Sequence, residues 1–237
     1  MPTMKSKLIF LHGGPGYPDY LEQFFSNQFS DDVETVFYTQ LQKKDTSMDD
    51  LLAQIGSHVG EGDEPVYLVG HSWGGALAID YLRKTDDPRI KGIVLICSYL
   101  HVEDLTVEFR KELARLKMKD PTPTEIFLAP DEVDEAGDLM AHLDRKFNKV
   151  FFKKISDEFI SKFDALKFVQ KMKIPILNVF GEFDVRIPTR RMRLYSKLGP
   201  HIRNVEIRGS AHFPFIREKD QKQVVEAIET FMAETKS

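Results

Sequence analysis

The sequence predicts an α/β protein built on a doubly wound, mainly parallel sheet of about six strands. Three observations support this fold class. Short apolar runs of the kind buried on both faces of a parallel sheet recur along the chain. Amphipathic segments with helical spacing separate these runs, and the connections are short. Glycine-rich turns follow two of the runs at the ends where functional groups gather in such sheets.

The composition is that of an ordinary globular protein. Its 237 residues suffice for one large domain, or for one domain with an inserted lid. The net charge of -4 and the lack of a dense Lys/Arg block argue against a nucleic-acid partner. A single cysteine excludes a disulfide framework and a multi-cysteine metal site. No apolar run suits a membrane span or a signal peptide, so we expect a cytoplasmic protein with no membrane partner.

The first part of the chain alternates strands and helices. We predict strands at residues 7–11, 33–38, 66–69 and 90–96, and helices at 18–29, from 47 to about 60, and from the turn at 70–74 to about 84. The second of these helices has the clearest start, because Ser47 and Asp50 match a capping box. Gly60 and Gly62 end it.

The alternation of strand and helix patterns is interrupted between residues 99 and 168. This stretch is rich in charged residues and proline, and its apolar residues recur at helical intervals. We therefore predict a helical cap or lid insertion at 99–168, with the core formed by 1–98 and 169–237. Alternation resumes after it, with strands predicted at 174–180 and 204–208, a helix at about 189–198, and a last helix near the C-terminus.

The turn Gly70-His71-Ser72-Trp73-Gly74 matches the G-x-S-x-G pattern between a strand and a helix, which is the setting of a nucleophile elbow. Such a turn holds its serine on a strained backbone, and the strain costs roughly 1–3 kcal/mol. The glycines allow strand and helix to pass closely. The helix N-terminus below the serine favours negative charge. Ser72 is therefore the candidate nucleophile, and an ordinary Gly/Ser turn is the alternative.

A second glycine-rich turn, His12-Gly13-Gly14-Pro15-Gly16, follows the first strand. A phosphate-binding loop is one interpretation, but the spacing fits neither G-x-G-x-x-G nor a P-loop. The better interpretation is an oxyanion hole, in which such a loop presents a backbone N–H to the nucleophile.

A serine nucleophile needs a base, usually a histidine oriented by a carboxylate. Of the seven histidines, only His212 lies in a short loop after a strand and outside the two glycine turns. We therefore predict His212 as the base; a loop histidine at a helix start is the alternative.

Two carboxylates, Glu182 and Asp184, follow the strand at 174–180. Asp184 is favoured because it lies farther past the strand and can turn toward the next loop, although it could instead cap the following helix. The resulting chain order of Ser, Asp and His is the order found in α/β-hydrolases.

These motifs resemble those of the α/β-hydrolase superfamily, and His12-Gly13-Gly14-Pro15-Gly16 with Gly70-His71-Ser72-Trp73-Gly74-Gly75 resembles its proline iminopeptidase branch. The resemblance implies an α/β-hydrolase fold with Ser72 as nucleophile, Asp184 as acid and His212 as base. It implies the backbone N–H groups of Gly14 and Trp73 as oxyanion donors, and a structural role for His12. No cofactor or metal is implied.

In iminopeptidases, lid carboxylates hold the free amino group of the substrate. The candidates here are Glu103, Asp104, Glu108, Glu125 and Asp131, and the sequence places none of them. Substrate-binding residues thus stay unknown at this point. Cys97 is expected to be a core residue, Trp73 either walls an acyl pocket or simply packs, and the phenylalanines at 147, 151, 152, 159 and 163 are expected mainly in the core of the insertion.

The predicted function is that of a serine hydrolase acting on a small-molecule ester, amide or short peptide through an acyl-enzyme. A prolyl aminopeptidase is the alternative, and preference for a free α-amino group would distinguish it. A non-catalytic small-molecule binding protein on the same fold is an alternative from another class, which a failure of Ser72 to react with a fluorophosphonate would favour. A lyase or perhydrolase using the same triad is a third option.

Overall fold

The computed structural model describes residues 5–235 and contains a six-stranded sheet whose paired strands are all parallel. Its order is β2-β1-β3-β4-β5-β6, so the chain winds outward from the middle in both directions. This confirms the predicted fold class. The strands are β1 (Ser6–Leu11), β2 (Val33–Phe37), β3 (Val66–His71), β4 (Ile90–Ile96), β5 (Ile176–Gly181) and β6 (Ile202–Ile207).

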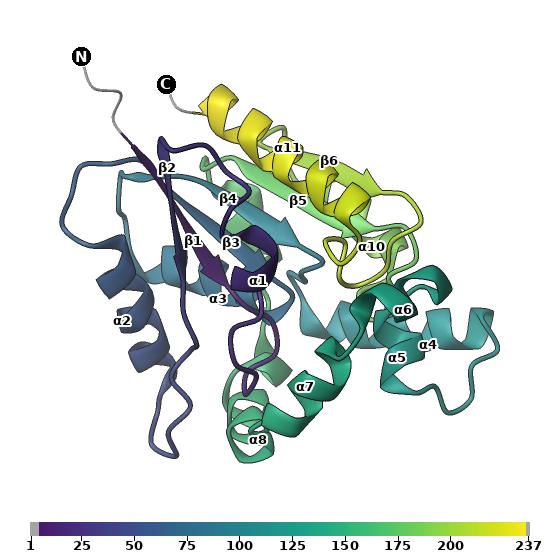
Figure 1. The fold of residues 1–237 in the computed structure, drawn as a ribbon. Coiled ribbons are helices and arrows are strands. Elements are labelled where there is room, and N and C mark those ends of the chain that lie inside the picture. The colour runs from purple at the N-terminus through teal and green to yellow at the C-terminus, as the bar shows by residue number, and fades with distance from the viewer. Residues whose placement is uncertain (1–4, 236–237) are drawn as a thin grey trace.

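Helices cover both faces of the sheet (Figure 1). On one face lie α2 (Met48–Val59), α3 (Trp73–Lys84) and α9 (Leu166–Lys171); on the other lie α1 (Glu22–Phe25) and α11 (Glu218–Thr235). The strands serve both layers because successive side chains point to opposite faces. In β1, Ile9 packs with α2 and α3, whereas Leu8 and Phe10 pack with α1 and α11. The sheet therefore lies between two apolar cores.

The 99–168 segment is helical, as predicted, and contains no strand among the described elements. It comprises α4 (Val102–Arg115), α5 (Pro123–Phe127), α6 (Val133–Ala136), α7 (Leu139–Lys146), α8 (Lys149–Glu158) and two 3₁₀ turns, η1 (Pro130–Glu132) and η2 (Ile160–Lys162). Figure 1 shows α4–α8 gathered at the end of the sheet toward which the strand arrows point, away from both termini. The segment thus covers the carboxyl ends of the strands.

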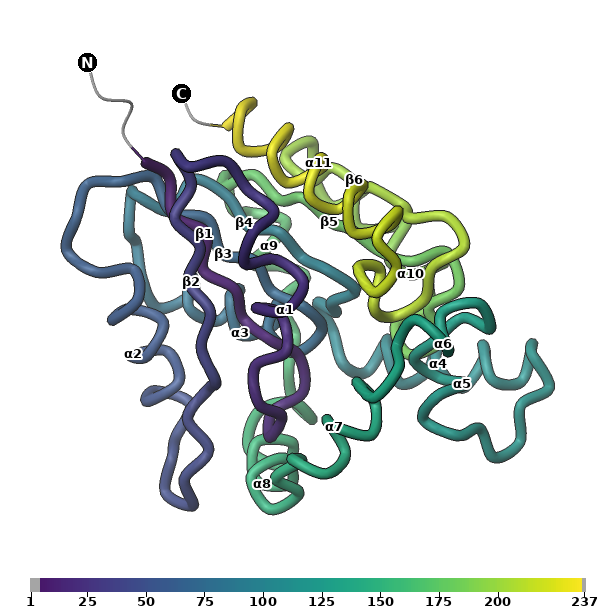
Figure 2. Tube along the Cα trace, in the orientation of Figure 1, coloured from purple at the N-terminus to yellow at the C-terminus, as the bar shows by residue number. Residues whose placement is uncertain are grey.

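The loop after β1 and the 99–168 segment lie side by side at this end, as the trace in Figure 2 shows. The N–H of Asn148 donates to the carbonyl of Gly16 at 2.8 Å, which joins the loop to the start of α8. Gly16 has a φ of +101°, and a Cβ there would come within 2.7 Å of the Asn148 carbonyl oxygen. Glycine is needed at this position to let the two segments approach.

Two predicted helices are shorter in the structure. Of residues 18–29, only Glu22–Phe25 are helical. The aromatic residues of this segment instead make separate contacts: the hydroxyl of Tyr20 bonds to His71, and the ring of Phe29 packs against Phe10.

The predicted helix at 189–198 is divided into α10 (Thr189–Met192) and the 3₁₀ turn η3 (Tyr195–Lys197). Side-chain amides of Asn178 and Asn204, on the neighbouring strands, donate to the carbonyls of Met192 and Arg193 at 3.2 and 3.0 Å. These carbonyls are satisfied without a continuing helix, so the helix can end there.

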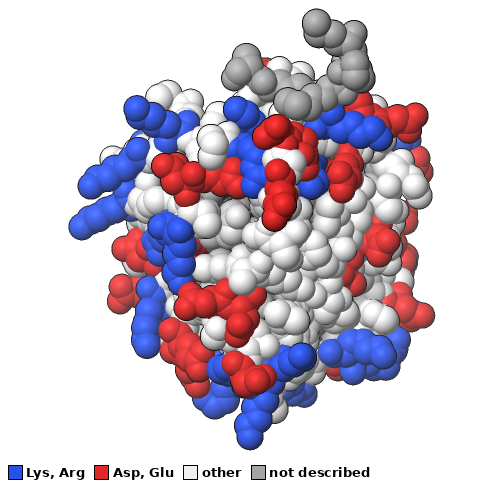
Figure 3. Space-filling view, turned by 90° about the vertical axis from the view of Figure 1, so that its left-hand side faces the viewer, with Lys and Arg blue, Asp and Glu red and all other residues white. Residues whose placement is uncertain are grey.

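The surface carries charges of both signs. On the face drawn in Figure 3, lysine and arginine side chains are interspersed with aspartate and glutamate around a largely uncharged centre. Among residues 5–235, none of the helices is both long enough and apolar enough to cross a membrane.

Candidate active site

Ser72 occupies a strained turn between β3 and α3. Its φ of 53° and ψ of -116° lie outside the regions that a serine normally adopts. The amide of Ser72 donates to the carbonyl of Ile96 at 2.8 Å, and the hydroxyl of Ser98 donates to the carbonyl of Ser72 at 2.7 Å. The neighbouring strand thus holds the backbone of this turn in place.

The glycines on either side of Ser72 are required by space. A Cβ on Gly70 would lie 2.4 Å from the amide nitrogen of Gly75, and a Cβ on Gly74 would lie 2.0 Å from the carbonyl oxygen of Leu11. Strand and helix therefore pass at a distance that only glycine allows, as the sequence pattern indicates.

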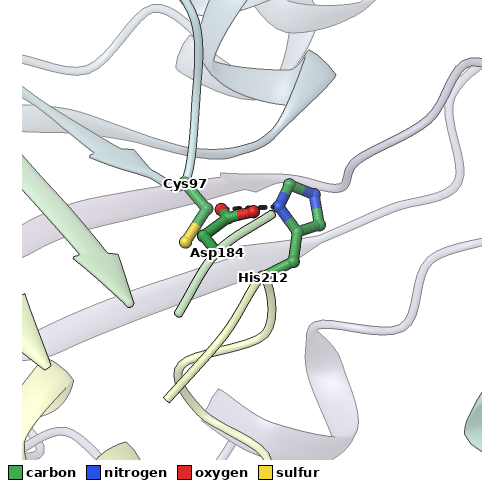
Figure 4. Close-up of side chains that lie close together, drawn as sticks. All are labelled: Cys97, Asp184 and His212. Carbon is green, nitrogen blue, oxygen red and sulfur yellow. Dashed lines mark hydrogen bonds and ion pairs between the residues drawn. The ribbon is translucent and has the colours of Figure 1, made fainter. Parts of the chain in front are cut away.

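Asp184 and His212 meet in a direct hydrogen bond. The Oδ2 atom of Asp184 lies 2.9 Å from Nδ1 of His212, and both side chains are buried (Figure 4). The other oxygen of Asp184 accepts the N–H of Ile187 at 2.8 Å. Glu182 instead accepts the N–H of Gly209 at 3.0 Å. The structure therefore pairs His212 with Asp184 rather than with Glu182.

Cys97 lies beside this pair and is fully buried, as expected of a core residue. Its sulfur, an oxygen of Asp184 and a nitrogen of His212 lie within 4.8 Å of one another, a spacing that could suit a metal ion. A cysteine ligand must be a thiolate. Burial, together with the charge of Asp184, raises the pKa of Cys97 well above its usual range. The cluster is better explained as a neutral thiol packed against a hydrogen-bonded Asp–His pair.

Glu132 is a buried carboxylate that the sequence does not single out. It lies in η1 and holds the loop that carries His212, because it accepts the Ser210 hydroxyl at 2.6 Å and the Ala211 amide at 3.1 Å. It also accepts the amide of Ala129 at 2.8 Å. Burial raises the pKa of Glu132, and these hydrogen bonds offset part of the effect. The 99–168 segment thereby fixes the position of the His212 loop.

Replacing Glu132 with leucine is expected to lower the free energy of unfolding by about 2–5 kcal/mol, because the Ser210 hydroxyl and the Ala211 amide lose their buried acceptor. Urea denaturation measures this change. Glu135→Leu, at an exposed position in α6, is the matched control and should change stability by less than about 1 kcal/mol. Equal stabilities of the two variants would contradict the tethering role of Glu132.

His71 links the two glycine turns through a directional chain of hydrogen bonds. Its Nε2 donates to the carbonyl of His212 at 2.8 Å, so its Nδ1 accepts the hydroxyl proton of Tyr20. The oxygen of Tyr20 in turn accepts the N–H of Gly13 at 2.7 Å. Burial, reinforced by the nearby His212, lowers the pKa of His71 well below its usual range, so His71 is neutral. The chain positions the Gly13–Gly14 loop relative to the His212 loop.

His12 braces the first glycine turn. Its Nε2 accepts the amide of Gln40 at 3.1 Å and its Nδ1 lies 3.0 Å from the carbonyl of Gly13. Gln40 also donates to the carbonyl of His12 and accepts the indole N–H of Trp73. Burial lowers the pKa of His12 to about 4. The structural role implied by the family resemblance agrees with these contacts.

The neutral His12 should make the fold sensitive to acid. Its pKa is about 4 in the folded protein and about 6.5 in an unfolded chain, so between these values only the unfolded chain binds the proton. Stability therefore falls as the pH falls through this window. Between pH 7 and pH 5, we expect the free energy of unfolding to fall by about 2 kcal/mol less in His12→Gln than in the wild-type protein, as measured by urea denaturation. An unchanged loss in the variant would show that His12 does not contribute.

Ser72 and His212 line the same cavity, which has a volume of about 310 Å³ and lies between the two glycine turns and the 99–168 segment. Most of its wall is apolar or aromatic; two of the phenylalanines expected in the core of the insertion, Phe147 and Phe152, belong to it. The indole of Trp73 does not. It is buried, bonded to Gln40 and packed against Phe159, which favours the packing interpretation.

None of the acidic residues considered for binding an amino group lines this cavity within the described chain. Asp104 pairs with Arg191, and Asp131 pairs with Arg217. Glu108 pairs with Lys111, Glu125 caps α5 through Thr122, and Glu103 is exposed. The cavity therefore differs from one built to hold a substrate ammonium group.

The sequence matches that of known hydrolases over most of its length. The profile of the Alpha/beta hydrolase family matches residues 8–227. The chain is 37% identical over 93 residues to a proline iminopeptidase of Chitinophaga pinensis, a match that covers 34% of this chain and only 31% of that relative. It is 24% identical over 252 residues to the proline iminopeptidase of Heyndrickxia coagulans, which covers 90% of this chain and 86% of the relative.

Solved structures share the fold over nearly the whole chain. A thermophilic esterase from Thermogutta terrifontis superposes with a TM-score of 0.74 at 16% identity, over 99% of this chain and 92% of that one. A proline iminopeptidase-related protein from Thermus thermophilus superposes with a TM-score of 0.75 at 17% identity, over 99% and 91% of the two chains. Both likenesses extend through the 99–168 segment.

Proposed function

Because the chain belongs to the alpha/beta hydrolase family, we propose that it is a serine hydrolase that cleaves a small carboxylic ester or amide through an acyl-enzyme intermediate. The observation that carries this proposal is the buried hydrogen bond between Asp184 and His212, at a cavity that Ser72 also lines. No cofactor has a part in the proposed chemistry.

In the proposed mechanism the hydroxyl of Ser72 attacks the substrate carbonyl, and Nε2 of His212 takes its proton. Asp184 accepts the Nδ1–H of the same ring, which leaves Nε2 free as the base and stabilises the imidazolium that forms. His212 then gives the proton to the leaving group. A water molecule, activated by the same histidine, hydrolyses the acyl-enzyme and restores Ser72.

The oxyanion of the tetrahedral intermediate would accept the backbone N–H groups of Gly14 and Trp73. Trp73 is the first residue of α3, where amides have no partner within the helix. A Cβ on Gly13 would lie 3.0 Å from Cβ of Ser72, so the first glycine turn lies against the serine. The amide of Gly13 is already bonded to Tyr20, which favours Gly14 as the second donor.

The cavity supports an ester as substrate better than a peptide with a free N-terminus, because no carboxylate among its lining residues would bind the ammonium group. A prolyl aminopeptidase is the second candidate, because the relatives from Chitinophaga pinensis and Heyndrickxia coagulans are named proline iminopeptidases. Initial rates with p-nitrophenyl butyrate and with prolyl p-nitroanilide separate the two. We expect faster turnover of the ester; strong preference for the prolyl anilide would support the aminopeptidase instead.

A further inference from the structure

Arg186 brings a positive charge to the wall of the cavity. It follows Asp184 by two residues in the loop between β5 and α10, and its side chain lines the cavity together with Ser72 and His212. Among the described residues that line this cavity, it is the only lysine or arginine, and none is an aspartate or glutamate. Ser72 therefore lines a largely apolar cavity that contains one cationic side chain.

The guanidinium of Arg186 has no carboxylate partner within residues 5–235. Its contact is with an aromatic ring, since its Cζ lies 5.6 Å from the ring centroid of Phe109. Two other arginines at this end of the sheet, Arg191 and Arg217, are each paired with an acidic residue of the 99–168 segment. A half-buried guanidinium loses part of its hydration, and without a counter-ion this loss is uncompensated.

Two tyrosines, Tyr17 and Tyr99, line the same cavity as Arg186. Burial raises the pKa of both phenols, and at Tyr17 the negative charge of Asp144 adds to this effect, whereas the positive charge of Arg186 acts on both phenols in the opposite direction. Neutral phenols can donate hydrogen bonds, and a guanidinium offers up to five donors. A carboxylate accepts hydrogen bonds from both kinds of donor, and its negative charge makes the bonds to a guanidinium shorter and stronger than those of a neutral acceptor.

From this arrangement we infer that Arg186 selects substrates that carry a carboxylate, separated from the scissile ester or amide carbonyl by a short apolar chain or ring. The inference rests on the hydrolase function proposed above and names the substrate class. An anion in the apolar cavity would interact with Arg186 in a low local dielectric, where charge–charge attraction is stronger than in water. It would also restore a counter-ion to the guanidinium.

Two matched pairs of esters test this inference on either side of the scissile bond. On the acyl side, mono-p-nitrophenyl glutarate is compared with the p-nitrophenyl ester of glutaric monoamide. On the leaving-group side, 4-acetoxybenzoate is compared with 4-acetoxybenzamide. In at least one pair we expect kcat/KM to be about 10–100-fold higher for the carboxylate, the range of charge-assisted hydrogen bonds. A ratio near or below one in both pairs would overturn the inference.

Variants assign the preference to Arg186. Arg186→Gln should bring the ratio to about one while hydrolysis of the neutral ester continues, and Arg186→Lys should keep part of the preference. Arg190→Gln, at an exposed arginine in α10 outside the cavity, is the matched control and should keep the wild-type ratio. An unchanged ratio in Arg186→Gln would overturn the inference.

A binding measurement separates this inference from the hydrolase proposal. We expect calorimetry to show that glutarate binds the Ser72→Ala protein and that the additional change Arg186→Gln weakens binding about 10-fold or more. Arg186-dependent binding without turnover of any ester would uphold the carboxylate site and contradict the hydrolase function. Hydrolysis of neutral esters with no carboxylate preference and no glutarate binding would uphold the hydrolase function and contradict the carboxylate site.

Discussion

Replacing Ser72 with alanine is expected to lower kcat by a factor on the order of 10⁶, as loss of the nucleophile does in enzymes with a Ser-His-Asp triad. In the proposed mechanism the cavity and the amides of Gly14 and Trp73 would still bind the substrate, so a small residual rate should persist. Folding should be little affected, because alanine and serine are equally strained at a φ of 53°. Initial rates with p-nitrophenyl butyrate and thermal denaturation measure the two effects.

Ser57→Ala is the matched control for this variant. Ser57 lies exposed in α2, and its loss should leave kcat within about twofold of the wild-type value. A folded Ser72→Ala protein that retained a tenth or more of the wild-type kcat would show that another group attacks the ester.

Changing Asp184 to asparagine is expected to lower kcat by about 10⁴. The Oδ1 atom of Asp184 accepts the amide of Ile187, and an asparagine oxygen can keep that bond. The asparagine NH₂ group then faces Nδ1 of His212, which must accept rather than donate. The ring would carry its proton on Nε2, the nitrogen that is needed as the base.

Glu182→Gln is the control for this effect, because Glu182 lies two residues earlier and binds the amide of Gly209 instead of His212. We expect its kcat to fall less than 10-fold. The reverse pattern, a large loss in Glu182→Gln and a small loss in Asp184→Asn, would make Glu182 the orienting carboxylate. Steady-state kinetics of both variants at one pH decide between the two.

Local patterns in the sequence predict most of the fold. The apolar runs at β1, β3 and β4 are buried on both sides, and short apolar runs bounded by turn residues are typical of central strands in a parallel sheet. The capping box at Ser47 predicts the start of α2, and the structure has the reciprocal hydrogen bonds with Asp50. The turn around Ser72 can also be predicted from the sequence, because the close approach of strand and helix permits only glycine at positions 70 and 74.

Features that depend on contacts between distant segments could not be predicted. The spacing of Tyr20 suits the helix predicted at 18–29, whereas in the structure its hydroxyl reaches His71, 51 residues later in the chain. Glu132 contacts a loop 78 residues away. Nothing in the sequence around Arg186 distinguishes it from a solvent-exposed arginine, and only the folded structure places it at the cavity. Such contacts are set by packing, which no short pattern encodes.

The central proposal, that Ser72 is activated by His212 as a nucleophile, is tested most directly by covalent labelling. The folded protein is treated with a fluorophosphonate, and the modified residue is identified by mass spectrometry of its peptides. We expect one adduct, on Ser72, that disappears in Ser72→Ala and forms far more slowly in His212→Ala. A folded wild-type protein that gives no adduct, or gives its adduct on another residue, would contradict the proposal.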